Sequence, residues 1–138
     1  MQSGDAEALR LAQLAELYWY TGQPEMGLHL LAAAMAADTE ERCDVSGRYR
    51  MKGELLLLLP CPDLQQAESC LQHALALARR QHAKMPELRA ALRLSRLWQH
   101  QGKCVEAREL LAPVYSWFTE GFATADLQKA KALLDELA

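Results

Sequence analysis

The chain has 138 residues, of which 51% are hydrophobic, and its formal net charge is −3 at pH 7. This length fits a single domain with a buried core, and the excess of leucine and alanine over β-branched residues predicts an all-α fold. The negative balance argues against a nucleic-acid partner, and no apolar run is long enough for a membrane span. With four unpatterned cysteines and no signal-peptide pattern, we expect a cytoplasmic protein.

Hydrophobic periodicity predicts seven helices in chain order. Pro24 suits a first helical turn, Asp63 and Thr124 suit N-caps, and Pro113 should kink the helix that contains it. The polar segment 38–44 is expected to connect two helices. The expected helices are 6–21, 24–37, 45–59, 63–82, 86–102, 105–120 and 125–137, with Gly121 ending the sixth.

A small residue recurs every 40 residues along the chain, at Gly27, Ala67 and Ala107. A leucine follows each of them four positions later, and a small or β-branched residue follows three positions after that, so each set lies on one helix face. A second series of small residues precedes them, each followed three residues later by a large side chain: Ala15, Gly53 and Ser95. Small residues on both helices of a hairpin allow close backbone approach, so we expect each at a close helix–helix contact.

The chain therefore divides into three helical hairpins, about 6–37, 45–82 and 86–120, closed by an amphipathic cap helix at 124–137. The pattern of large and small residues in the first and third hairpins resembles the tetratricopeptide repeat (TPR). The middle hairpin departs from it, because Lys52 replaces a large apolar residue and the turn around Pro60–Pro62 is longer. HEAT-like repeats have similar periods but lack the pairing of a small residue with an aromatic one, so they rank second.

The resemblance implies a right-handed α-α superhelix, a TPR-like solenoid whose first helices line a concave groove. Aligned on the small residues, the positions expected to face that groove are Glu16, Trp19, Tyr20, Arg50, Glu54, Leu57, Leu58, Arg89, Leu92, Arg96, Gln99 and His100.

About the last 55 residues carry a narrower resemblance, which includes Trp98, Gly102, Pro113 and Trp117. They are similar to the C-terminal tail of large bacterial signalling proteins that join a class III adenylate or guanylate cyclase domain to an AAA-type ATPase module. This implies that the chain is such a tail or a free-standing relative of it. Neither catalytic part is present, since the sequence contains no phosphate-binding G-x-x-x-x-G-K-[ST] loop and no identifiable cyclase aspartate pair.

Two pairs of side chains are candidates for metal binding or nucleophilic chemistry. Cys70 and His73 lie three residues apart, and His100 and Cys104 lie four apart. No C-x-x-C or H-x-x-x-H pair completes a zinc site, and no glycine-rich strand–turn supports a nucleophile. Buried cysteines are ordinary in helical repeats. We therefore expect no catalytic residue, no metal and no cofactor, and hence no enzyme.

Charge gives the strongest indication of a partner. Residues 79–108 hold eight lysines and arginines against two glutamates, and Arg89, Arg93 and Arg96 form one stripe of a helix. For any single arginine a solvated helix face is the alternative interpretation. Together they favour a scaffold that binds a protein or peptide, acidic or ending in a carboxylate. The alternative is a ligand-sensing module that controls an attached cyclase, ATPase or transcription factor.

The first helix is apolar around most of its circumference, with Leu9, Leu14 and Leu17 on different sides. A repeat array usually begins with a solvated face. We therefore expect self-association, as a homodimer, or docking through this N-terminal helix.

Overall fold

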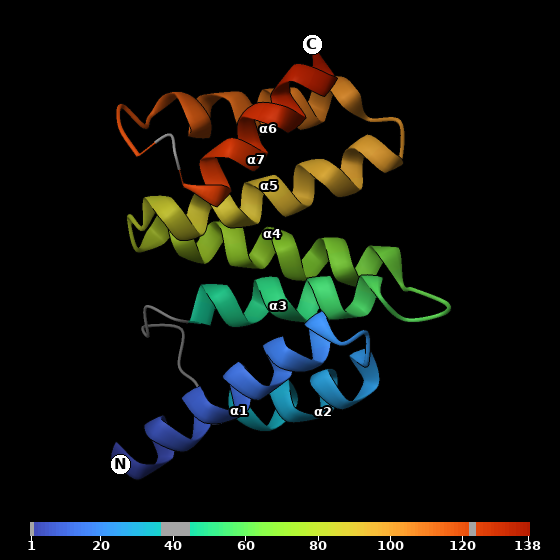
Figure 1. The fold of residues 1–138 in the computed structure, drawn as a ribbon, viewed down its shortest axis with the longest axis vertical. Coiled ribbons are helices and arrows are strands. Elements are labelled where there is room, and N and C mark those ends of the chain that lie inside the picture. The colour runs from blue at the N-terminus through green and yellow to red at the C-terminus, as the bar shows by residue number, and fades with distance from the viewer. Residues whose placement is uncertain (1, 37–44, 122–123) are drawn as a thin grey trace.

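The structure is a computed structural model that describes residues 2–36, 45–121 and 124–138. Over those residues it contains seven α-helices and no β-strand, which confirms the all-α prediction (Figure 1). The helices are α1 (Gln2–Tyr20), α2 (Pro24–Met35), α3 (Val45–Leu57), α4 (Leu64–Arg80), α5 (Lys84–His100), α6 (Cys104–Ser116) and α7 (Ala125–Leu137). The predicted connection at 38–44 lies outside the described residues.

Most helix ends lie close to the predicted positions. Asp63 is the N-cap of α4 and accepts a hydrogen bond from the backbone N–H of Gln66 at 3.0 Å, whereas Thr124 occupies the N-cap position of α7 without a side-chain bond. The prediction for α6 is wrong at its C-terminus, because the helix ends at Ser116 rather than near 120. Pro113 has no N–H to continue the ladder, and Trp117 and Phe118 instead bond three residues back in a tightened last turn.

Three helices end in the same hydrogen-bonded turn. After α1, the N–H of Gln23 donates to the Tyr18 carbonyl at 2.9 Å, and Gly22 has a φ of 73°. The same pattern follows α5, where Gly102 has a φ of 80°, and α4, where His82 takes the left-handed position with a φ of 55°. This is the Schellman motif, which glycine normally completes.

Replacing His82 by glycine is therefore expected to raise the free energy of unfolding by about 0.5–1 kcal/mol, because the β-carbon disfavours the left-handed conformation. Gly102→Ala is the matched control. The methyl group that this substitution adds meets open space. Gly102→Ala should therefore lower the free energy of unfolding by a similar amount, through the backbone conformation alone. Urea unfolding curves measure both, and a neutral or destabilising His82→Gly would contradict this assignment.

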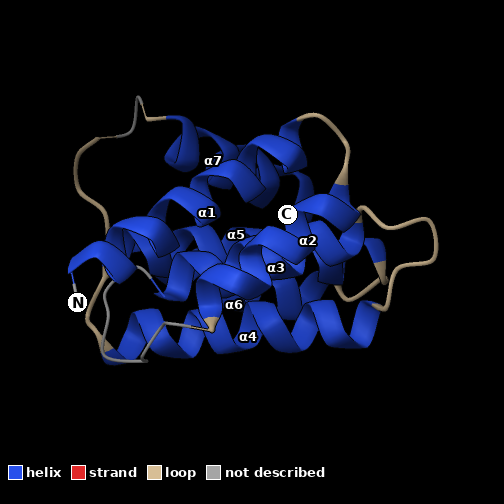
Figure 2. Ribbon diagram, turned by 90° about the horizontal axis from the view of Figure 1, so that it is seen from below, coloured by secondary structure: helices blue, strands red, loops and turns tan. Residues whose placement is uncertain are grey.

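The helices pack against their neighbours in the chain, and the odd-numbered helices also pack against one another. Each helix contacts the next one, and in addition α1 contacts α3, α3 contacts α5, and α5 contacts α7. Among the described residues α2 makes no comparable contact with α4, nor α4 with α6. The odd-numbered helices therefore form one continuous layer, with the even-numbered helices outside it. Figure 1 shows the hairpins stacked along the long axis, and Figure 2 shows α4 and α7 at opposite sides of the molecule.

The recurring small residues lie where helices touch, as predicted. A β-carbon added to Gly53 would lie 2.9 Å from the Leu71 Cγ atom and 3.2 Å from the Ala67 carbonyl oxygen. Ala67 and Ala107 have no exposed surface, and the Ser95 hydroxyl donates to the Ala107 carbonyl at 3.2 Å. Each hairpin is thus closed by a contact that a larger side chain would block.

Within the described part of the chain, none of the helices has both the length and the apolar character that crossing a bilayer requires.

Candidate functional site

The odd-numbered layer contains two hollows between its helices. The larger, here called the tryptophan groove, has a volume of about 560 Å³. It is lined by Trp19 of α1, by Glu54 and Leu57 of α3, by Leu58 in the turn after α3, by Leu64 of α4, and by Arg93, Arg96, Leu97 and His100 of α5. The smaller, here called the arginine hollow, has a volume of about 400 Å³ and includes Glu16, Arg48, Arg50 and Arg89.

The predicted site residues are thus divided between two places. Trp19, Glu54, Leu57, Leu58, Arg96 and His100 come together in the tryptophan groove, whereas Glu16, Arg50 and Arg89 line the arginine hollow.

Three predicted residues line neither hollow. Tyr20 is largely exposed and packs edge-on against Trp19, with ring centroids 4.8 Å apart. Gln99 donates to the Glu136 carboxylate of α7 at 3.1 Å. Leu92 is fully buried, so its assignment to the groove is wrong. Helix α5 contacts α3, α4, α6 and α7, so more of its circumference is covered than in a helix at the end of the stack.

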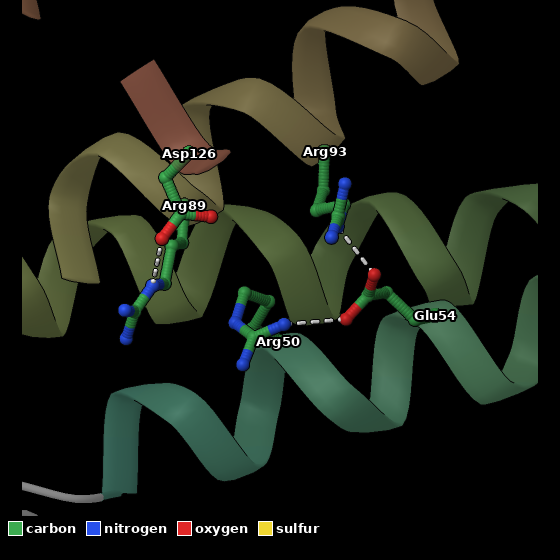
Figure 3. A network of polar contacts seen from close by, with 5 residues as sticks. All are labelled: Arg50, Glu54, Arg89, Arg93 and Asp126. Carbon is green, nitrogen blue, oxygen red and sulfur yellow. Dashed lines mark hydrogen bonds and ion pairs between the residues drawn. The ribbon is translucent and has the colours of Figure 1, made fainter. Parts of the chain in front are cut away.

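Glu54 is the centre of a charge network between α3 and α5 (Figure 3). Its side chain is 6% exposed and accepts a hydrogen bond from Arg50 Nη1 at 2.6 Å. Its other carboxylate oxygen forms an ion pair with Arg93. Two arginines therefore share one buried carboxylate, and the pairing connects the second hairpin to the third.

Most of the predicted arginine stripe is neutralised by neighbouring helices. Arg89 pairs with Asp126 of α7 at 2.9 Å, and Arg93 pairs with Glu54 (Figure 3). Arg79 pairs with Glu87 at 3.2 Å. These arginines are paired within the protein, so the excess of positive charge in segment 79–108 overstates the charge available to a partner.

Arg96 differs from the rest of the stripe. It lines the tryptophan groove, and among the described residues it has neither an ion pair nor a hydrogen-bond partner. His100 lies one helical turn further along the same face and is exposed. The groove therefore offers a guanidinium that no described residue occupies, and an imidazole, beside an apolar surface.

That apolar surface comes from separate helices. Trp19 and Leu57 are partly buried, while Leu58 and Leu64 are each 43% exposed. A side chain bound there would lose contact with water against an indole ring and several leucines. The sequence interpretation missed Leu64, because it considered only the first helix of each hairpin. The longer turn around Pro60–Pro62 was the available signal, since it sets where α4 begins.

In the described structure neither Cys–His pair belongs to a larger group of potential metal ligands. Cys70 packs in a buried cluster with Leu56 and Ala67, and the His73 ring lies edge-on to Tyr49 with centroids 4.3 Å apart. Over residues 2–36, 45–121 and 124–138, no group of three or more histidine, cysteine or acidic side chains is placed to hold a metal ion.

Burial raises the pKa of the Cys70 thiol, and the nearby Lys52 opposes part of that shift. The unfolded chain would ionise this thiol at its ordinary pKa of about 8.5, whereas the folded protein keeps the proton to higher pH. The contribution of this thiol to stability is therefore complete below about pH 8.5 and falls as the pH rises. Denaturation between pH 7 and pH 10 should show less alkaline destabilisation in Cys70→Ala than in the parent. Cys104→Ala, at an exposed thiol, should behave like the parent.

No protein-family model matches the chain, and no curated protein sequence matches it significantly.

Proposed function

We propose that the protein is a non-catalytic interaction module that binds a segment of a partner protein in the tryptophan groove. One observation carries this proposal: a hollow of about 560 Å³ in which Trp19, Leu57 and Leu58 lie beside Arg96, which pairs with none of the described residues. Its lining comes from three successive odd-numbered helices and the start of α4. An extended or helical segment can therefore contact all of them at once.

The preferred segment combines apolar side chains with a carboxylate. Glu54 is occupied by Arg50 and Arg93, so it adds no free negative charge to the groove. Arg96 then gives the groove a positive charge, and its guanidinium fits a side-chain or C-terminal carboxylate bidentately. Single exposed ion pairs contribute little, so the apolar contacts with Trp19 and Leu57 supply most of the affinity.

We also propose that the stack is a right-handed TPR-like superhelix. Support comes from the continuous layer of odd-numbered helices, the repeated Schellman turns and the close contacts at Gly53 and Ala107. The resemblance of the C-terminal half further supports a relation to the tails of bacterial cyclase–ATPase signalling proteins. Exposed free thiols at Cys61 and Cys104 are typical of a reducing cytoplasm.

A peptide library that varies acidic and apolar positions tests the binding proposal. Acidic sequences with leucine or phenylalanine should be enriched, and binding of a selected peptide, measured by fluorescence anisotropy, should weaken as salt is added. Arg96→Gln should weaken that binding about tenfold, and Leu57→Ser should weaken it further.

Arg89→Gln is the matched control, since Arg89 lies on the same helix but pairs with Asp126 outside the groove. It should bind like the parent. Enrichment of basic peptides, or equal loss of affinity in Arg89→Gln and Arg96→Gln, would contradict the proposal.

A further inference from the structure

The outward side of α1 is apolar and exposed in the described structure. Leu14 is 38% exposed and Leu17 is 58% exposed. This surface is distinct from the tryptophan groove, which neither residue lines. Binding at this surface is therefore independent of binding in the groove.

The second and third hairpins show what covers the equivalent helix face there. Aligned on the small residues Ala15, Gly53 and Ser95, the residues equivalent to Leu17 are Leu55 in α3 and Leu97 in α5. Leu55 is fully buried and Leu97 is 5% exposed. The residue equivalent to Leu14 in α5 is Leu94, which is 1% exposed. The same helix face is thus buried in the third hairpin and open in the first.

A helix of the preceding hairpin covers this face in α3 and α5. Helix α2 packs on α3, and α4 packs on α5. A β-carbon built on Gly27 of α2 would lie 2.9 Å from Leu55 Cδ2, so Leu55 fills the space left by the missing side chain. Ala67 takes the same repeat position in α4 and is fully buried. A leucine seated against a small residue is therefore the interface between the first and second hairpins.

We propose that the face of α1 formed by Leu14 and Leu17 binds an α-helix of a partner protein that lies on α1 as α2 lies on α3. The bound helix carries glycine or alanine where it meets Leu17, with apolar residues one turn away on either side. A longer side chain at that position would hold the two helices apart.

A second copy of this chain fits the face less well than a separate partner. The three helices with the required small residue are α2, α4 and α6, and each is already covered by the helix that follows it. Gly27, Ala67 and Ala107 are all buried, so the helix faces that carry these small residues are already occupied in another copy. This argues against the expected homodimer and favours docking of another protein.

A stapled helical peptide with the sequence of residues 23–36 serves as the probe, because it reproduces the helix that covers α3. It should bind the full chain, and Leu17→Ala should weaken binding about tenfold or more. A peptide carrying leucine in place of Gly27 should not bind. The thermal unfolding of Leu17→Ala should match the parent, since Leu17 is more than half exposed.

Leu58→Ala, which changes the tryptophan groove, is the control and should leave peptide binding unchanged. The proposal is overturned if the peptide does not bind, or if it binds Leu17→Ala as well as the parent. It is also overturned if sedimentation equilibrium shows a dimer that Leu17→Ala dissociates, because the face would then join two copies.

Discussion

Glu54→Ala is expected to lower the free energy of unfolding by about 2–4 kcal/mol, because it leaves two arginines close together without their shared carboxylate. Arg50 and Arg93 are 18% and 22% exposed at their side chains, so water relieves only part of the cost of leaving them unpaired. Glu54→Gln, which keeps a hydrogen-bond acceptor but removes the charge, should lie between the parent and Glu54→Ala. Chemical denaturation followed by helical circular dichroism measures all three.

Asp135→Ala is the control for this experiment. Asp135 pairs with Lys131 at 3.4 Å, and both side chains are more than 60% exposed. Its removal should change stability by less than about 0.5 kcal/mol. If Glu54→Ala costs no more than Asp135→Ala, the network does not hold the second and third hairpins together.

Gly53→Ala should give an unfolding free energy about 1–3 kcal/mol below that of Gly47→Ala, although both changes are made in α3. Alanine favours a helix interior over glycine by about 1 kcal/mol. At Gly47, in the first turn, the new methyl group meets open space, so no steric cost opposes the gain there. At Gly53 it would press on Leu71 Cγ and on the Ala67 carbonyl oxygen, which belongs to the backbone and yields little.

The same denaturation measurement decides this comparison. Equal stabilisation by the two substitutions would mean that α3 and α4 can separate at no cost. The close contact at the small residues would then not determine the geometry of the hairpin.

Local sequence signals predicted the helices well. The periodic apolar positions located all seven, and Asp63 marked the start of α4 by a cap that forms as expected. The turn after α4 was harder to locate, because histidine is not a usual signal for the left-handed conformation that His82 adopts. The early end of α6 at Ser116 depends on how the chain continues after Pro113, which lies inside the helix.

The candidate site was only partly predictable, because its charges are paired across long sequence separations. Arg89 pairs with Asp126, 37 residues away, and Arg93 pairs with Glu54 of a different hairpin. No periodicity within one helix reveals such partners. Leu92 was misassigned for a related reason, since its burial depends on how many helices surround α5.

The indole Nε1–H resonance of Trp19 gives the most direct test of binding in the tryptophan groove. Titration with a selected acidic, leucine-containing peptide should shift this resonance together with the methyl signals of Leu57 and Leu58. The indoles of Trp98, which donates to Glu68, and Trp117, which lies outside the groove, should stay in place. Shifts centred on Trp117, or saturable binding that leaves Trp19 and Leu57 unchanged, would contradict a peptide site in this groove.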